Sequence, residues 1–526
     1  MSQLLVVAGA PGQRRTALYD RLLRLYWRCC GARPADEARL PGHDIAHFGR
    51  PRGDWVPIAR SGATFAACAG TWFYRGRAGT LGLQAVCEDL ANSARIEDVL
   101  ENLDGFFALV VPGTVPDSTT VATDRQGILH LYEARLDGCL VLATSSLVLA
   151  AASGADWNLD GVREYVALGN VFEERTLFQG IRKLPPATLL SYSGREGEPV
   201  AERLWWDQAA VSWDRAAIEG TEDALASSLQ EALHMIGRNF DNTLIDLTGG
   251  FDSRAIYAAA LNAGVAFSTM VAGRPDHPDV VCARRIAGLF GTAARHRELP
   301  AFQPDEWLPR LRRALTLCDG ECDLFPYARV LNTQDKLWPE FQVTVNGSAG
   351  GITKGLWWEL LGSKVGQLGH FDARKVAARR YATRPEPERL WARRFEHSLT
   401  DHFTEVIRRV NRGFEGSRNT AVMDNTYLRI RLHRWMGRTA SSTVRLWDCV
   451  TPFVLRRPLE TMLAAPAQLR ARFGLARRLI ERQNPRLAQL PVAEGYPAAP
   501  MRWSNVHRFG IPMAMEQLGQ IGRAHV

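Results

Sequence analysis

Residues 244–254 read Leu-Ile-Asp-Leu-Thr-Gly-Gly-Phe-Asp-Ser-Arg, and this stretch decides the fold of the second half of the chain. A β-rich run ends in a Gly-Gly turn, and the helical pattern 255–261 follows an acid and a hydroxyl. The free N–H groups and the dipole at a helix N-terminus favour a bound anion. The stretch therefore predicts a phosphate-binding loop between a strand and a helix.

Five residues of this loop are candidate ligands. The glycines allow close approach of the backbone, and the hydroxyls add donors, so the predicted phosphate-binding residues are Thr248, Gly249, Gly250 and Ser253. Asp252 would repel a phosphate directly, and we expect it to hold a Mg²⁺ that bridges to the phosphates. The lysine of a Walker A loop is absent, which excludes an ordinary P-loop. A generic strand–turn–helix connection is the alternative.

The loop resembles the pyrophosphate loop Ser-Gly-Gly-x-Asp-Ser of the N-type ATP pyrophosphatases, with Thr248 in place of serine. Other segments resemble asparagine synthetase B-type enzymes in their order and spacing, over about residues 60–490. They are 98–111, 122–132, Leu177–Pro186 shortly before Trp205-Trp206, and Thr451-Pro-Phe453. The resemblance implies ATP and Mg²⁺ as cofactors and cleavage of ATP between its α and β phosphates.

Two domains are expected. Short apolar runs at 108–111, 129–132 and 140–144 predict strands, and the resemblance implies an Ntn-hydrolase-like antiparallel sandwich over 1–207, a degenerate class II glutamine amidotransferase-like domain. Runs at 243–247, 268–272 and 343–345 predict buried strands with helices between them. The resemblance implies an adenine-nucleotide α-hydrolase-like (PP-loop) α/β domain with a helical portion over 215–519. Ligands of such open sheets collect at the carboxyl ends of the strands.

The glutaminase site implied by the resemblance is not intact. Working glutaminases of this type carry cysteine directly after the initiator methionine, and here that position is Ser2. Gly70–Tyr74 stands where an Asn-Gly-Glu substrate clamp is expected. We therefore expect no glutaminase activity.

A second glycine-rich loop, 345–355, departs from the resemblance. Its relatives carry a Gly-Asp-Gly-Gly-Asp-Glu-type string, whose acids fall here on Ser348, Gly351 and Ile352. The remaining backbone donors are predicted to bind pyrophosphate through Gly347, Ser348 and Gly350. Two replacements for the lost acids are open. One is Glu359, and the other is the cluster Asp319, Glu321 and Asp323, from which Glu321 is the candidate second metal ligand.

Other expected site features follow from the same resemblance. The catalytic lysine of relatives matches Arg477 in the stretch Ala476–Ile480, and an arginine can stabilise negative charge but cannot act as an acid. Asp276, His277 and Asp279 follow the second strand, and a surface turn is the better interpretation. The residues Trp357, Trp358, Trp435 and Trp447 could line a substrate pocket, although core packing is the commoner role at these spacings.

Bulk properties fit a large cytoplasmic enzyme. The chain has 526 residues, 46% hydrophobic residues and a formal net charge of +8. The nine cysteines form no framework, which indicates reduced thiols. No apolar run reaches the roughly 18–20 residues of a membrane span, and the basic residues are spread thinly, so neither membrane nor nucleic acid is an expected partner. Residues 520–526 resemble a non-native tail.

Together these features predict an ATP-dependent ligase that forms AMP and pyrophosphate. It would adenylate a carboxylate, and an amine acceptor, either a small molecule or a peptide, would then attack to form an amide. β-Lactam synthetases and lasso peptide cyclases are family members of this kind, which suggests a role in natural-product biosynthesis. The alternatives are asparagine synthesis from free ammonia and a catalytically weakened homologue that only binds nucleotide or a partner. The sequence names neither substrate nor oligomeric state.

Overall fold

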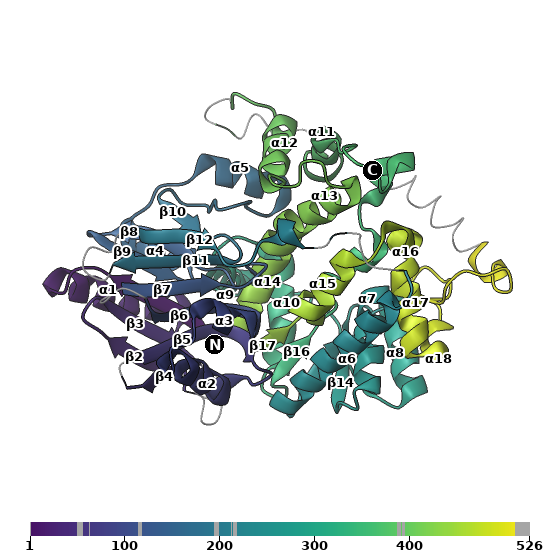
Figure 1. Cartoon of the computed structure of the whole chain (residues 1–526), viewed down its shortest axis with the longest axis horizontal. Coiled ribbons are helices and arrows are strands. Elements are labelled where there is room, and N and C mark those ends of the chain that lie inside the picture. Colours follow the sequence, from purple (N-terminus) through teal and green to yellow (C-terminus); the bar gives the residue numbers. More distant parts are fainter. Residues whose placement is uncertain are drawn as a thin grey trace. The chain divides into compact units, whose positions relative to one another are not determined.

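A computed structural model describes residues 2–49, 56–62, 64–113, 118–193, 199–211, 213, 218–384, 386, 391 and 395–510. Packing divides the chain into two compact units (Figure 1). The first comprises 1–210, 302–331 and 368–448, and the second comprises 211–301, 332–367 and 449–526. The domain limits expected from the sequence, 1–207 and 215–519, stay a prediction, and the tail 520–526 lies outside the described residues.

The first unit contains two six-stranded antiparallel sheets. One has the order β10-β8-β9-β1-β3-β2, with β1 Gln3–Ala8, β2 Asp36–Arg39, β3 His43–Phe48, β8 Tyr132–Leu136, β9 Cys139–Ala143 and β10 Ile181–Lys183. The other has the order β12-β11-β7-β6-β5-β4, with β4 Ile58–Ser61, β5 Thr64–Tyr74, β6 Leu103–Pro112, β7 Ser118–Thr123, β11 Thr188–Ser193 and β12 Pro199–Leu204.

Helices cover one face of each sheet. Helices α1 (Gln13–Cys30) and α4 (Ser146–Ser153) share a hydrophobic core with the first sheet, and α2 (Gly79–Ala91) and α3 (Ile96–Glu101) share one with the second. The two sheets meet through their other faces, where the rings of His43 and Phe65 lie 5.6 Å apart. The antiparallel architecture predicted for this part of the chain is therefore present, with helical layers added.

One predicted strand is wrong. Residues 129–131 belong to a buried loop, and β8 begins only at Tyr132. The Asp124 carboxylate accepts hydrogen bonds from the backbone N–H groups of Gln126, Ile128 and Leu129. Of the predicted run itself, the N–H of Leu129 is satisfied in this way, and that of His130 donates to Ser441 Oγ. Side chains thus satisfy these donors without a neighbouring strand, which explains why an apolar run here does not join a sheet.

The first unit is completed by a set of helices, several of which surround a buried polar cluster. They are α5 Leu159–Leu168, α9 Trp307–Cys318, α12 Leu399–Val410, α13 Asn419–Thr426, the π-helix η7 Tyr427–Met436 and α14 Gly437–Val444. The consecutive elements α13, η7 and α14 form one run of helical backbone from 419 to 444.

The second unit is built on a five-stranded sheet with the order β15-β14-β13-β16-β17. Its strands are β13 Thr243–Asp246, β14 Phe267–Ala272, β15 Ala293–Arg297, β16 Val343–Val345 and β17 Asp448–Val450. The pairs β13/β14, β13/β16 and β14/β15 are parallel. The three strands predicted in this part of the sequence are confirmed to within one residue at each end.

Helices come before, between and after the strands of the second unit along the chain. They include α6 Thr221–Asn239, α7 Phe251–Asn262, α8 Pro278–Phe290, α15 Arg456–Ala464 and α17 Gly474–Gln483. Helix α17 packs against α7 and against the short 3-10 helix η3, Gly350–Lys354. The two glycine-rich loops singled out in the sequence therefore share one supporting helix.

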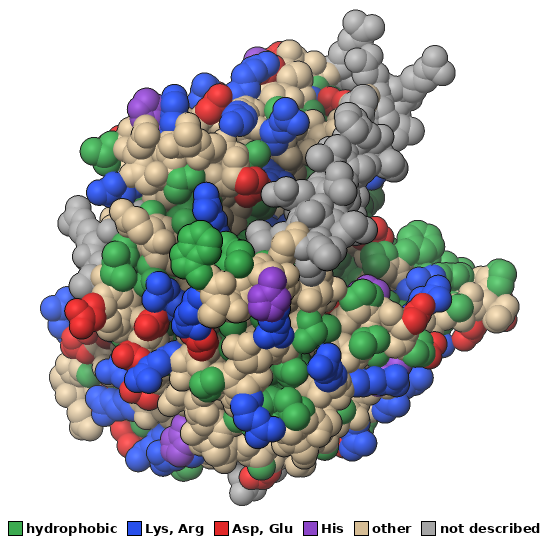
Figure 2. All heavy atoms as spheres, turned by 90° about the vertical axis from the view of Figure 1, so that its right-hand side faces the viewer, with side chains coloured by type: hydrophobic (Ala, Val, Ile, Leu, Met, Phe, Trp, Pro, Cys, Tyr) green, Lys and Arg blue, Asp and Glu red, His purple; other side chains and the backbone are tan. Residues whose placement is uncertain are grey.

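The surface carries both signs of charge. On the face drawn in Figure 2, Lys and Arg side chains lie dispersed among Asp and Glu side chains rather than in one block. In the described part of the chain, none of the helices is both long enough and apolar enough to cross a lipid bilayer.

Candidate functional site

The candidate site lies where β13 ends and α7 begins. Gly250 is the N-cap residue of α7, with extended backbone angles of φ −79° and ψ 170° and no side-chain cap on the helix. The first N–H groups of a helix have no partner within the helix, so this end of α7 presents donors and a partial positive charge. The local structure is the strand–turn–helix arrangement that the sequence predicts.

The hydroxyls of the first loop bond within the loop. Thr248 Oγ1 and Ser253 Oγ lie 2.9 Å apart, and Ser253 Oγ accepts the N–H of Thr248 at 3.1 Å. The N–H of Gly250 donates to Thr248 Oγ1 at 3.1 Å. These contacts hold the turn in shape, and an anion would compete with them for the same donors.

Asp279 contacts the loop, which corrects its interpretation as part of a surface turn. Its Oδ1 accepts the N–H of Gly249 at 2.8 Å. A side chain at Gly249 would clash with Ala493, whose Cβ and backbone N would lie 2.8 and 2.9 Å from an added Cβ. Gly249 thus makes room for a neighbouring segment, and its amide is engaged by a carboxylate.

The second glycine-rich loop follows β16 and packs directly on Asp252. A Cβ added to Gly350 would lie 2.6–2.7 Å from atoms of the Asp252 side chain, and one added to Gly347 would lie 2.8 Å from its carbonyl carbon. These glycines therefore permit close approach of the loop to Asp252. The structure brings Asp252 together with Gly347 and Gly350, all three of which the sequence singled out.

Lys354, the last residue of η3, is a site residue that the sequence reasoning missed. Its Nζ lies 2.7 Å from Asp252 Oδ2, and both side chains are partly buried, with 17% and 26% of their surfaces exposed. The signal was present in the sequence, because Lys354 lies in the loop that has lost its acids. A lysine in that loop supplies a cation where carboxylates were expected.

Two of the predicted backbone donors of this loop are engaged inside it. The N–H of Ser348 donates to Asn346 Oδ1 at 3.0 Å, and the N–H of Gly350 donates to the carbonyl of Gly347 at 3.2 Å. Their role in binding pyrophosphate stays a prediction. These bonds shape the turn that brings Lys354 to Asp252.

The residues present do not fit a metal site made of several carboxylates. Among the described residues, no group of three or more His, Cys, Asp or Glu is placed to hold a metal ion. Asp252 offers one buried oxygen, Oδ1, that lacks a hydrogen-bond partner in the described structure, while Oδ2 is paired with Lys354. Glu359 is exposed in η4, Trp358–Lys364.

Arg477 lies in α17 behind the first loop. Its Nη1 donates to the carbonyls of Pro497 and Ala499 at 2.8 and 3.0 Å. Its guanidinium also lies 4.9 Å from the ring centroid of Phe251 and 5.1 Å from that of Tyr496. Arg477 thus packs on Phe251, the residue that precedes Asp252, and these contacts give it a positioning role. The catalytic role predicted for Arg477 stays a prediction.

Asp246 adds a titratable group at the end of β13. Burial raises the pKa of its carboxyl group to about 7, and Oδ1 has no hydrogen-bond partner among the described residues. A carboxyl with a pKa near neutral can exchange a proton at physiological pH. Asp246 lies in a strand that the sequence predicts, but it is not among the predicted site residues.

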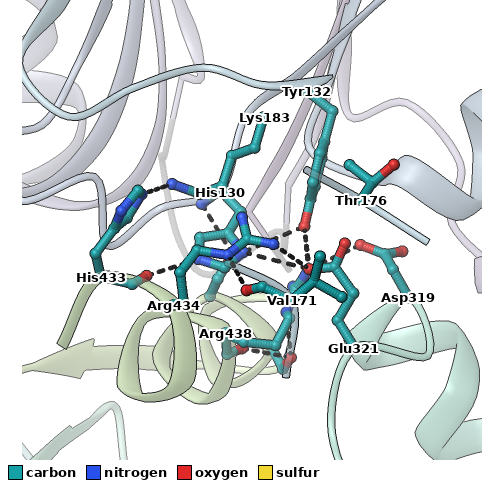
Figure 3. Close-up of polar contacts among 12 residues, drawn as sticks. His130, Tyr132, Val171, Thr176, Lys183, Asp319, Glu321, His433, Arg434 and Arg438 are labelled. Carbon is teal, nitrogen blue, oxygen red and sulfur yellow. Dashed lines mark hydrogen bonds and ion pairs between the residues drawn. The ribbon is translucent and has the colours of Figure 1, made fainter. Parts of the chain in front are cut away.

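Glu321, the candidate second metal ligand, belongs to a buried polar cluster in the first unit (Figure 3). Its Oε2 accepts from the hydroxyl of Tyr132 at 3.0 Å and lies 3.5 Å from Arg434 Nη2. Asp252 belongs to the second unit. These contacts give Glu321 a structural role, and its role as a magnesium ligand stays a prediction.

The neighbouring Asp319 anchors two buried arginines. Its carboxylate accepts from Arg438 Nη1 at 2.9 Å and from Arg445 Nη2 at 2.6 Å. Ser145 Oγ donates to the same carboxylate at 2.6 Å. Burial alone would raise the pKa of Asp319, but the two guanidinium groups hold it below its ordinary value. Asp319 is thus a buried structural anion.

Basic side chains lie on the other side of the cluster. Figure 3 shows Lys183 pointing toward His433, and the two side chains are in direct contact. Burial lowers the pKa values of Lys183, His433 and His130 well below their ordinary ranges. The cluster therefore combines paired charges around Asp319 with buried side chains that favour their neutral forms.

Ser2 is buried in the first unit. Its Oγ accepts the N–H of Gly70 at 2.7 Å and lies 3.5 Å from His47 Nε2. Gly70 has φ 113°, and an added Cβ would meet the carbonyl oxygen of Phe106 at 1.9 Å, so only glycine fits there. The hydroxyl of Ser2 is thus held inside the protein by a backbone amide.

Comparison with known proteins gives one family match. Residues 90–206 match the family model of the glutamine amidotransferase domain. A search of curated proteins finds no match. The similar solved structures include two at 11% identity. One, the allosteric regulatory enzyme of purine biosynthesis, has a TM-score of 0.25 with 56% of this chain and 80% of that chain covered.

The other is glutamine phosphoribosylpyrophosphate amidotransferase from B. subtilis, with ADP and GMP bound. Its TM-score is 0.24, with 51% of this chain and 65% of that chain covered. The matched segment 90–206 lies in the first compact unit, where it includes β6, β7 and β11. The family match thus points to an amidotransferase-type domain in this unit.

Proposed function

We propose that the protein is an ATP-dependent ligase that adenylates a carboxylate, releases pyrophosphate and forms an amide with an amine. The observation that carries the proposal is the meeting of two glycine-rich loops at Asp252, after the parallel strands β13 and β16. Anions bind at such strand ends and helix N-termini. The sequence of the first loop, similar to that of ATP pyrophosphatases, directs the proposal to ATP rather than to another phosphate ester.

In the proposed reaction, a carboxylate oxygen forms a bond to the α-phosphorus of ATP as the bond from that phosphorus to the β-phosphate oxygen breaks. The amine nitrogen then bonds to the carbonyl carbon of the acyl adenylate and loses a proton, and AMP leaves. The N-terminus of α7 would stabilise negative charge on the phosphates. Holding both reactants together supplies much of the acceleration. A role in specialised or peptide natural-product biosynthesis is part of the proposal.

A second candidate function is nucleotide binding without efficient turnover. The ion pair between Lys354 and Asp252 favours it, because the acid that would hold a metal is engaged by a lysine. Asparagine synthesis from ammonia is a narrower variant of the main proposal, distinguished by its substrates. The products formed from ATP with different acids and amines distinguish these candidates.

We expect the protein to convert ATP to AMP and pyrophosphate, with little ADP, when it is supplied with an acceptable acid and amine. The loop sequence predicts attack at the α-phosphorus. Nucleotide products separated by chromatography, with a panel of amino acids and peptides as substrates, test this prediction. Aspartate with ammonium is one arm of the panel. ADP as the main product would contradict the assignment.

We also expect glutamine to be ineffective as a nitrogen source. Ser2 stands in place of a cysteine nucleophile, and its hydroxyl is held by the amide of Gly70 in a buried position. Incubation with glutamine should release glutamate no faster than a blank without protein. Steady release above that blank, lost in Ser2→Ala, would show instead that the serine works as a nucleophile.

A further inference from the structure

We propose that Lys354 is a phosphate-binding residue whose ammonium group lets the site bind pyrophosphate without a divalent cation. This inference rests on the proposed function and deepens it, because it names the group that recognises the leaving pyrophosphate. Lys354 is not among the site residues that the sequence predicts. In the structure it brings positive charge to the loop that lacks acids.

The geometry places the charge at the strand ends. Lys354 Nζ lies 2.7 Å from Asp252 Oδ2, and Asp252 is in the first turn of α7. A lysine ammonium has three N–H donors, so the bond to Asp252 leaves donors for phosphate oxygens. Because both side chains are partly buried, their charges are screened less than those of surface ion pairs.

The backbone donors of the two loops strengthen the case for a side-chain cation. The N–H groups of Gly249 and Gly250 in the first loop are engaged, and so are those of Ser348 and Gly350 in the second. Pyrophosphate carries several negative charges, and the start of α7 contributes only about half a charge. The ammonium of Lys354 is paired with Asp252, but its remaining N–H groups are charge-assisted donors, which the helix end and these amides lack.

The second glycine-rich loop is shaped to hold Lys354 in this position. Gly350 approaches the Asp252 side chain so closely that any added Cβ would displace it. Thr353 Oγ1 donates to the carbonyl of Gly350 at 2.7 Å, which fixes the turn of η3 from which Lys354 extends. Lys354 is therefore positioned before any ligand arrives, and Asp252 serves as the holder of the ammonium.

Calorimetric titration of the full-length protein with inorganic pyrophosphate in EDTA tests the inference. Wild-type protein should bind pyrophosphate. Lys354→Met should raise the Kd for pyrophosphate by at least about tenfold, since one charge-assisted hydrogen bond is lost. Lys354→Arg, which keeps the charge, should retain most of the affinity. Lys364→Met removes an exposed lysine of η4 and should leave the Kd unchanged.

The outcomes separate this inference from the proposed function. If wild type and Lys354→Met bind pyrophosphate equally in EDTA, or if both bind only when Mg²⁺ is added, Lys354 does not have this role while the ligase proposal stands. If wild type binds neither pyrophosphate nor ATP with or without Mg²⁺, both proposals fail. Circular dichroism of each variant checks folding. A folded Lys354→Arg that binds as weakly as Lys354→Met would also overturn the role of the charge.

Discussion

Asp252→Asn is expected to lower the rate of AMP formation by roughly 100-fold or more. Lys354 loses the carboxylate that positions it, and misplacing a group at the reacting centre by about 1 Å can cost that much. The substitution keeps the size of the side chain but removes the charge that holds Lys354 Nζ at 2.7 Å. It also removes the negative charge shared with Oδ1, a buried oxygen that has no hydrogen-bond partner among the described residues. Nucleotide products separated by chromatography, with an acid that wild-type protein accepts, give the rate.

A second variant tests whether the position of this carboxylate matters as much as its charge. Gly350→Ala leaves both charges in the chain, but its Cβ would lie within 2.7 Å of the Asp252 side chain and must displace it. We expect a loss comparable to that of Asp252→Asn. Gly288→Ala, in α8, is the matched control, since nothing lies within 4 Å of an added Cβ there.

Asp276→Asn is the control for the loss of charge. Asp276 is exposed, pairs with Arg274 and follows β14, the strand beside β13. Its substitution should leave AMP formation within about twofold of wild type, since exposed ion pairs contribute little. Equal rates for Asp252→Asn and wild type would remove Asp252 from the proposed mechanism.

The first glycine-rich loop could be predicted because its signals are local. A buried strand, a Gly-Gly turn and a helix N-terminus lie within about twenty residues. The spacing of the apolar residues locates the strand and the helix, and the glycines locate the turn. The strands β13, β14 and β16 were predicted for the same reason. The strand expected at 129–132 failed because the N–H groups of Leu129 and His130 donate to the side chains of Asp124 and Ser441, and apolar periodicity does not register such contacts.

The partners within the site could not be predicted because they come from distant segments. Lys354 lies 102 positions from Asp252, and Asp279 lies 30 positions from Gly249. Nothing in the local pattern of either loop encodes these distances. Gly347 and Gly350 are a further example. The sequence predicts them as backbone donors for pyrophosphate, whereas the structure shows that their lack of a side chain makes room for Asp252.

The acidic cluster 319–323 illustrates the difference between a residue type and its environment. Asp319 and Glu321 were candidates for a metal site because acids near a glycine-rich loop can bind Mg²⁺. In the structure both are buried in the first unit and bonded to arginine or tyrosine side chains. An acid predicted from the sequence to be a solvated metal ligand can equally be the counter-ion of buried arginines. Only the packing around the acid distinguishes these two roles.

Asp319→Asn is expected to destabilise the first unit by about 3–5 kcal/mol, the cost of leaving buried charges without their counter-ion. Asp319 has no exposed surface, and its carboxylate is the counter-ion of both Arg438 and Arg445. The asparagine keeps the shape and one acceptor oxygen but leaves two buried guanidinium groups without the negative charge of Asp319. Substitution therefore removes charge compensation without creating a cavity.

Asp137→Asn provides the matched comparison. Asp137 pairs with Arg21 at 2.8 Å, but about half of its side chain is exposed. Exposed pairs contribute roughly 0–1 kcal/mol, so this variant should unfold at nearly the same urea concentration as wild-type protein. Asparagine also tolerates the left-handed backbone at this position, where φ is 51°.

Hydrogen exchange locates the effect within the chain. In Asp319→Asn, protection should fall for peptides from 302–331 and 419–448, which contain Asp319 and its two arginine partners. Peptides from 243–262 in the second unit should exchange as in wild-type protein, because Asp319 and both arginines belong to the first unit. A shift no larger than that of Asp137→Asn would mean that water or a rearranged acceptor compensates the two arginines. The burial of Asp319 would then be a poor guide to its energetic role.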